Sequence, residues 1–190
     1  MEYWVESTIA QLTAAFTDSY NQAIDQVIEL LIERFRLGKT LLLCGNGGSA
    51  ADAQHIAAEL VGRFLANRQG LPAIALATNM ATLTAWSNDH EFATVFSRQV
   101  ESLGKPGDML WGISTSGRSQ NVILALQTAQ RMGITTIGMA GNNGGLLHDY
   151  VDYPLFVPQT HTPRVQEIHV ITYHRICEQV EARLFVEGKF

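Results

Sequence analysis

The chain has 190 residues, of which 46% are hydrophobic, and a formal net charge of −5. This length is typical of one domain with a full core, and the negative charge argues against a nucleic-acid-binding surface. There is no apolar run long enough to span a membrane and no secretory signal at the N-terminus, so we expect a soluble cytoplasmic protein without nucleic-acid or membrane partners.

The segment 5–36 has apolar residues at three- and four-residue spacing, which predicts one long helix that Gly38 ends. A helical segment of this length (1–37) is more than one small sheet needs as cover. We therefore expect it to pack on a partner chain.

A glycine-rich loop follows the first predicted strand, residues 41–44. Its sequence, Gly45-Asn46-Gly47-Gly48-Ser49, leads into a helix that carries His55 and Glu59. Glycines allow a ligand to approach the backbone, and free N–H groups at a helix start attract anions. Many such turns bind nothing, however, and the spacing matches neither the dinucleotide-binding nor the Walker pattern. His55 and Glu59 are four residues apart, so they share one face of the helix.

A second strand–loop–helix unit spans the strand 109–113, the loop 114–119 and the helix 120–132. Serine hydroxyls, backbone N–H groups and Arg118 in this loop suit a phosphate. The alternative is a helix cap, which needs one such hydroxyl. Four of the six loop positions carry a hydroxyl, which favours phosphate binding: Ser114, Thr115, Ser116 and Ser119.

The remaining predicted elements alternate in the same way. They are a strand at 73–77, a helical patch at 78–86, a polar break at 87–90, a helix at 91–103, strands at 134–139 and 153–157, and a last helix at 164–185. Five alternations predict one α/β domain over residues 1–190, with a five-stranded parallel sheet and helices on both faces. Ligands bind such sheets at the carboxyl ends of the strands, where both loops lie. The two cysteines, Cys44 and Cys177, fall in apolar segments and are expected as buried free thiols.

Taken in order, these motifs resemble the sugar isomerase (SIS) domain family and, within it, the isomerases of phosphorylated heptoses. The resemblance covers nearly the whole chain. It depends on the glycine loop 45–49, the helix segment 52–59, Asn88-Asp89, the serine loop 114–119 and the segment 164–174.

The resemblance implies an aldose–ketose isomerase that converts sedoheptulose 7-phosphate to D-glycero-D-manno-heptose 7-phosphate through an enediol. Such an enzyme supplies heptose for ADP-heptose and lipopolysaccharide-type biosynthesis. The implied acid–base pair is Glu59 and His174, and one zinc ion per active site would be held by His55, Glu59, Gln166 and His174. The implied substrate-binding residues are Asn46, Gly47, Gly48, Ser49, Glu59, Asn88, Asp89, Ser114, Thr115, Ser116, Ser119 and Gln166. Arg118 departs from the small polar residue expected in the loop, which leaves the choice of phosphosugar open.

The resemblance also implies a homo-oligomer, a tetramer, with shared active sites. Gln166 and His174 are eight residues apart on one predicted helix, or about 12 Å, whereas metal–ligand bonds are about 2 Å. Drawing Glu59 or His174 from a neighbouring chain would ease this constraint.

The other histidines are expected to do less. His169 is expected to support the site or pack at an interface. His90 is expected either near the sugar or at an exposed helix start, and His148 and His161 are assigned no role.

Two rival functions remain at this point. One is a non-catalytic SIS adaptor of the type that associates with a replication initiator, which would lack the Glu or the His that this chain keeps at Glu59 and His174. The other is an isomerase of a different phosphosugar.

Overall fold

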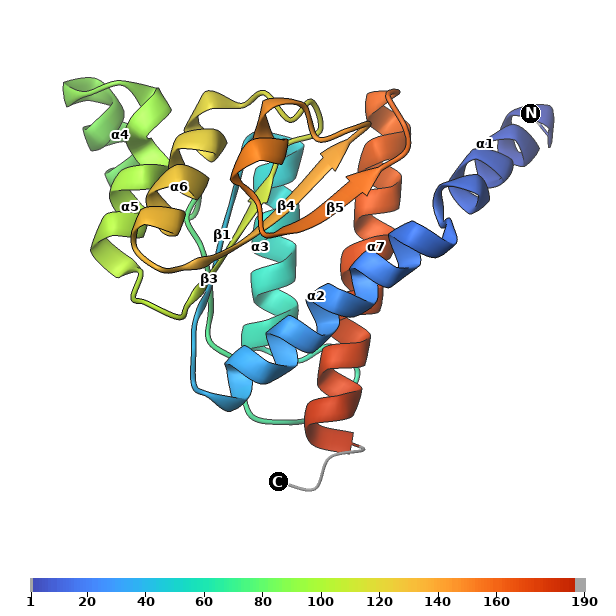
Figure 1. Cartoon of the computed structure of the whole chain (residues 1–190), viewed down its shortest axis with the longest axis horizontal. Coiled ribbons are helices and arrows are strands. Elements are labelled where there is room, and N and C mark those ends of the chain that lie inside the picture. The colour runs from blue at the N-terminus through green and yellow to red at the C-terminus, as the bar shows by residue number, and fades with distance from the viewer. Residues whose placement is uncertain (1, 187–190) are drawn as a thin grey trace.

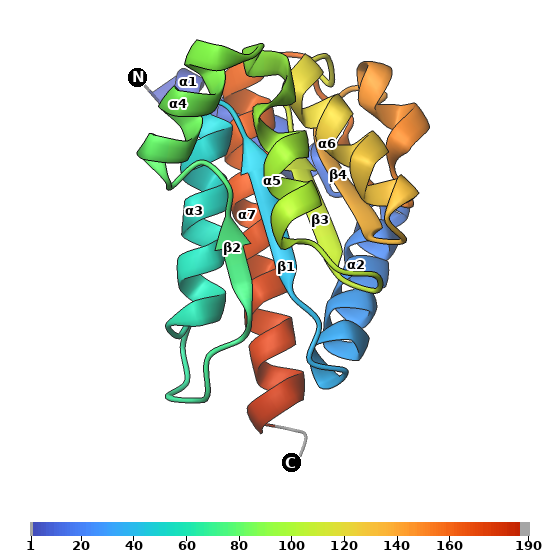
Figure 2. The ribbon, with the colours of Figure 1, turned by 90° about the vertical axis from the view of Figure 1, so that its left-hand side faces the viewer.

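A five-stranded, fully parallel sheet forms the centre of the molecule (Figures 1 and 2). The computed structural model describes residues 2–186, so Met1 and residues 187–190 of the expected domain lie outside the described part. The strands are β1 (Leu41–Gly45), β2 (Ala73–Ala75), β3 (Met109–Ile113), β4 (Thr135–Gly141) and β5 (Tyr153–Val157), in the order β2-β1-β3-β4-β5. The predicted fold class is confirmed.

Alternate residues of the strands face two separate cores, as the two-residue period of a strand requires. Leu41 and Leu43 face the core under α2 (Asp18–Arg36), α3 (Gly48–Val61) and α7 (Thr162–Glu181). Leu42 and Cys44 face the core under α5 (Val95–Leu103) and α6 (Gln120–Arg131). Burial on both faces explains why β1 and β3 read as unbroken apolar runs.

The N-terminal segment is two helices, α1 (Glu2–Ala15) and α2, and the expectation of one helix over 5–36 is wrong. Thr17 breaks it: its backbone is extended and its hydroxyl accepts a hydrogen bond from the N–H of Tyr20, which caps α2. On the N-terminal side of this break, α1 projects from the body of the chain (Figure 1) and exposes Trp4 and Ile9.

Three further boundaries differ from the sequence prediction. The predicted break at 87–90 is wrong because 87–89 form the last turn of α4 (Met80–Asp89), whose start is capped by Asn79. The predicted helix 91–103 begins as a short 3-10 helix, η1 (Phe92–Thr94), before α5. The last helix begins at Thr162, with Pro163 in its first turn, and passes into the π-helical turn η3 (Ala182–Val186).

The remaining loop between β4 and β5 contains the 3-10 helix η2 (Gly145–Tyr150). Cys44 and Cys177 are buried and unpaired, as expected, and burial raises the pKa of each thiol to about 12. None of the helices within residues 2–186 is both long and apolar enough to cross a membrane.

Candidate active site

The chain order reverses between β1 and β3, and ligands of open α/β sheets bind at such a point. The loop after β1 is joined there to the first turn of α6, which follows β3, by a reciprocal pair of amide hydrogen bonds between Asn46 and Asn121, each 2.8 Å long. A Cβ at Gly45 would lie 2.6 Å from the Ser49 carbonyl oxygen, so glycine lets the end of β1 meet the first turn of α3. Within residues 2–186, no side chain caps the N-terminus of α3.

The serine loop is held in shape from within. The Ser114 hydroxyl donates to that of Ser119 at 2.9 Å, which leaves the Ser119 proton free for another acceptor. Gly117 has a φ of +63°, and a Cβ there would collide with the Gly144 carbonyl. Ser119 stands at the N-cap position of α6 but its side chain makes no cap hydrogen bond. Helix capping alone therefore does not explain the hydroxyls of this loop.

We call the glycine loop 45–49, the serine loop 114–119 and Gln166 the sheet-edge cluster. Gln166 belongs here because a Cβ on Gly48 would lie 2.8 Å from its Nε2 atom. Beside the serine loop is a cavity of about 200 Å³, which Thr115, Ser116 and Arg118 line together with residues of the loop 141–145.

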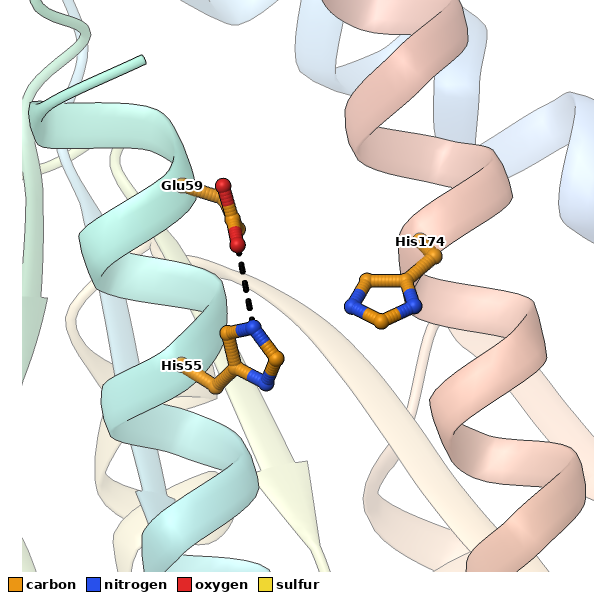
Figure 3. A group of neighbouring side chains, drawn as sticks. All are labelled: His55, Glu59 and His174. Atoms are coloured by element: carbon orange, nitrogen blue, oxygen red, sulfur yellow. Dashed lines mark hydrogen bonds and ion pairs between the residues drawn. The ribbon is translucent and has the colours of Figure 1, made fainter. Parts of the chain in front are cut away.

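A second group of side chains lies between α3 and α7, and we call it the helix-flank cluster (Figure 3). His55 and Glu59 project from α3, and His174 faces them from α7. His55 Nε2 lies 2.9 Å from Glu59 Oε1, and one ligand atom from each of the three residues lies within 4.8 Å of the others. The side chains of His55 and Glu59 are 44% and 20% exposed, so the group is accessible. The three residues form a possible metal-binding group.

The electrostatics of His174 follow from this position. Burial lowers the pKa of His174, the nearby His55 lowers it further, and the Glu59 carboxylate acts in the opposite direction. A lowered pKa favours the neutral imidazole, which can accept a proton or bind a metal.

Glu59 and His174 meet within one chain. The expectation that one of them comes from a neighbouring chain is therefore wrong for this pair, because the packing of α3 against α7 was not visible in the spacing of either helix. Gln166, which is also on α7, lies apart from this pair. Its side chain is beside Gly48, which precedes His55 on α3 by seven residues, or about 10 Å of helix.

The other predicted residues lie at the surface or in the core. Asn88 and Asp89 are exposed on the last turn of α4 and hydrogen-bond to each other. His90 ends α4, exposed, and stacks on Trp86 with ring centroids 4.0 Å apart. His169 is fully buried, and burial lowers its pKa to about 4 although the Ala140 carbonyl raises it; a packing role fits this site.

Three residues near the two clusters were missed from the sequence. Asn121 pairs with Asn46, and Tyr173 contacts His55 through its hydroxyl at 3.0 Å. The Asp52 carboxylate lies beside the Tyr173 hydroxyl as a hydrogen-bond acceptor. The available signal for Asp52 was its place one turn before His55 on the same helix. For Tyr173 the sequence holds no signal beyond its place next to His174.

Known proteins resemble this chain over nearly its whole length. A model of the family described as "SIS domain" matches residues 4–141. The phosphoheptose isomerase of Crocosphaera subtropica is 63% identical over 99% of this chain and 96% of its own length. The solved phosphoheptose isomerase of Neisseria gonorrhoeae is 38% identical, with a TM-score of 0.86 over 95% of this chain and 98% of that one. That of Francisella tularensis is 33% identical, with a TM-score of 0.89 over 94% and 95%.

Proposed function

The chain belongs to the SIS-domain family and, within it, to the phosphoheptose isomerases, and we propose that it interconverts sedoheptulose 7-phosphate and D-glycero-D-manno-heptose 7-phosphate. The product would supply ADP-heptose and lipopolysaccharide-type heptose synthesis. We also propose that the enzyme works in the cytoplasm, for which its two unpaired buried cysteines are the support.

The observation that carries this proposal is the convergence of Glu59 and His174. Isomerisation moves a proton between C1 and C2 and adjusts protons on the two oxygens. A carboxylate at Glu59 can take the proton from carbon, and a neutral imidazole at His174 can exchange protons with the oxygens. Each such positioned group typically contributes about 10²–10⁴-fold to the rate. A non-catalytic adaptor would have no need of this pair.

The donor atoms of the helix-flank cluster suit zinc, which binds imidazole nitrogen and carboxylate oxygen at about 2 Å. Their separations of up to 4.8 Å need only a small side-chain adjustment to surround one ion. In this proposal His55, Glu59 and His174 hold the metal, with Gln166 as the expected fourth ligand. When bound there, zinc would serve as a Lewis acid for the sugar oxygens.

The sheet-edge cluster is proposed to hold the rest of the substrate. The hydroxyls of Ser114, Thr115, Ser116 and Ser119 and the N-terminus of α6 would bind the phosphate. Residues 46–49 and Gln166, with Asn88 and Asp89, would line the sugar. Arg118 would add positive charge beside the phosphate.

The distance between the two clusters supports a homo-oligomer with shared sites. Glu59 lies eleven residues after Gly48, or about 16 Å along α3. From C1 to the phosphorus, a heptose 7-phosphate has eight bonds of about 1.5 Å each, a contour length of about 12 Å. We therefore propose that the sheet-edge cluster of one chain, including its Gln166, meets the helix-flank cluster of another. The projecting α1, with Trp4 and Ile9 exposed, is the proposed assembly surface of a tetramer.

The first test is turnover. Purified protein incubated with sedoheptulose 7-phosphate should form the aldose phosphate, and Glu59→Gln should abolish nearly all of it. A pentulose 5-phosphate offered in parallel tests the rival substrate. If the ketoheptose phosphate is not converted, with zinc present and the protein folded, the proposed reaction is wrong.

A mixing experiment tests the shared site. Glu59→Gln damages only the helix-flank cluster, whereas Ser116→Asp places a negative charge in the phosphate loop. Mixed oligomers of these two inactive chains should recover part of the activity, because some sites combine two intact clusters. Mixing Glu59→Gln with His174→Ala is the matched control and should recover none, because both lesions lie in the same cluster. The opposite pattern, with subunit exchange verified, would contradict the proposed arrangement.

A further inference from the structure

The Tyr173 hydroxyl links the helix-flank cluster to a carboxylate that no step of the proposed reaction uses. It lies 3.0 Å from His55 Nδ1, and the Asp52 carboxylate lies beside it as a hydrogen-bond acceptor. Asp52 and His55 are one turn apart on α3, and Tyr173 comes from α7. The Tyr173 side chain is 1% exposed, so water does not compete freely for these contacts.

The direction of the hydrogen bonds along this chain follows from the groups themselves. An ionised carboxylate only accepts hydrogen bonds, so the single hydroxyl proton of Tyr173 is donated to Asp52. The hydroxyl oxygen is then left to accept, and the donor within reach is Nδ1–H of His55. In a neutral imidazole, a proton on Nδ1 leaves the lone pair on Nε2.

This lone pair points at another electron-rich atom, because His55 Nε2 lies 2.9 Å from Glu59 Oε1. Two acceptors at this distance need a positive charge between them, which a proton or a metal ion supplies. The hydrogen bonds of the cluster therefore run in one direction. Asp52 and Tyr173 hold the Nδ1 side of the His55 ring, and the Nε2 side is presented to a cation.

We propose that Tyr173 and Asp52 are positioning residues of the metal centre, which act through His55 by fixing its ring orientation and presenting Nε2 as the ligand. This inference depends on the proposed metal site. Hydrogen bonds to the far nitrogen of a ligating histidine are a common support of metal sites, and losing one typically weakens metal binding by about 10–100-fold.

The position of Tyr173 gives this support a second effect. Tyr173 precedes His174 on α7, and its ring contacts the rings of both His55 and His174, with centroids 5.4 and 4.8 Å away. One turn of α7 thus supplies one ligand directly and orients another across the gap to α3. The two imidazoles lie 5.0 Å apart between centroids, and the Tyr173 ring contacts both of them.

The test measures metal affinity in metal-free full-length protein, by competition of Zn²⁺ with a chromogenic chelator, and the ligand field of bound Co²⁺ by visible absorption. Tyr173→Phe keeps the ring and removes the hydroxyl, so we expect about 10–100-fold weaker Zn²⁺ binding and an altered Co²⁺ spectrum. Asp52→Asn should weaken binding less, since an amide oxygen can still accept from Tyr173. The double variant should match Tyr173→Phe, because Asp52 acts through Tyr173.

Tyr20→Phe is the matched control. It removes another buried tyrosine hydroxyl, which hydrogen-bonds to Thr172, the α7 residue that precedes Tyr173. It should leave metal affinity unchanged, and circular dichroism should show all variants folded.

Two negative outcomes are distinguishable. If His55→Ala and His174→Ala bind Zn²⁺ as tightly as the parent, the metal site is wrong and the inference fails with it. If those two variants lose Zn²⁺ but Tyr173→Phe binds it like Tyr20→Phe, the metal site stands and the positioning role is overturned.

Discussion

Glu59 and Glu181 lie on the two helices that form one seam, α3 and α7, and their surroundings are opposite. The Glu181 carboxylate is 4% exposed and accepts hydrogen bonds from the N–H groups of Phe64, Leu65 and Ala66 and from Arg68 Nε, at 2.6 to 2.9 Å. A carboxylate has about four acceptor sites, so Glu181 has no capacity left for a ligand.

Glu59 has a side chain that is 20% exposed, and within the described residues its carboxylate has one polar side-chain neighbour at hydrogen-bonding distance, His55 Nε2 at 2.9 Å. It keeps acceptor capacity that faces His174 and the solvent. The comparison teaches that a saturated carboxylate holds the fold, whereas an unsaturated one beside two imidazoles can take a proton or a metal.

The two sites are also connected. The Arg68 guanidinium, which bonds Glu181, donates through its other nitrogens to the backbone carbonyls of Glu59 and Leu60. It thus caps the end of α3 and ties the turn that carries Glu59 to the end of α7. We call these contacts of Arg68 the Arg68–Glu181 node, and the first prediction concerns a variant that removes them.

Arg68→Ala should cause the largest loss of stability, because it leaves Glu181 buried without its partner and exposes carbonyls of α3. Removing one member of a buried pair typically costs about 3–5 kcal/mol. Urea unfolding at one fixed protein concentration measures it. Arg175→Ala is the control, since its pair with Asp25 is 48% and 62% exposed and should contribute at most about 1 kcal/mol. Equal losses in the two variants would contradict the assignment of Arg68–Glu181 as a structural node.

Glu59→Gln should show the reverse behaviour. We expect turnover to fall at least about 100-fold, which is about 2.7 kcal/mol in activation free energy, while the free energy of unfolding changes by less than about 1 kcal/mol. Glu101→Gln, which alters an exposed pair with Arg98, is the matched control and should leave both quantities near the parent values. Near-normal turnover of Glu59→Gln would sink its catalytic role.

Arg68→Lys sharpens the link between the two sites. It keeps a positive charge near Glu181 but loses the planar fork that reaches the carbonyls of Glu59 and Leu60. At about 1 kcal/mol for each lost hydrogen bond, we expect a loss of about 1–2 kcal/mol in unfolding free energy. Turnover should fall by less than in Glu59→Gln. An unchanged stability would show that the carbonyl contacts contribute nothing.

The smallest effect is a pH dependence. Burial alone raises the pKa of Glu181, but the N–H groups of Ala66, Phe64 and Leu65 and the Arg68 guanidinium together hold it below its ordinary value. Because the pKa of Glu181 is lower in the folded state than in the unfolded state, its ionised form stabilises the fold. This stabilisation is complete above the unfolded-state pKa of about 4.3, and it is lost as the pH falls through the folded-state pKa. The stability difference between the parent and Glu181→Gln should therefore narrow as the pH falls below about 4.3. A difference that stays constant down to pH 3 would rule out the lowered pKa.

Much of the fold could be predicted from the sequence because its signals are local. β3 and β5 occupy the predicted residues, and the remaining strands differ at their ends. The break between α1 and α2 was missed because the apolar spacing continues across it. The competing signal, a hydroxyl cap at Thr17, is one residue long.

The candidate site could be predicted in part for the same reason. His55 and Glu59 were placed on one face of a helix by their spacing alone, and in the structure His55 Nε2 lies 2.9 Å from Glu59 Oε1. Asp52, Tyr173 and Asn121 were missed because their roles depend on partners far away in the chain.

By itself, the sequence determined the alternation of strands and helices, the two loops at the carboxyl edge, the buried thiols and the His55–Glu59 pair. Each of these follows from residues a few positions apart, whose geometry the backbone fixes. Only the tertiary structure decided that α7 packs on α3 so that His174 and Tyr173 meet His55, that Glu181 is saturated and Glu59 is not, and that Gln166 lies by Gly48. These arrangements depend on which faces of distant helices bury apolar surface together, and the spacing within a single helix carries no information about that choice.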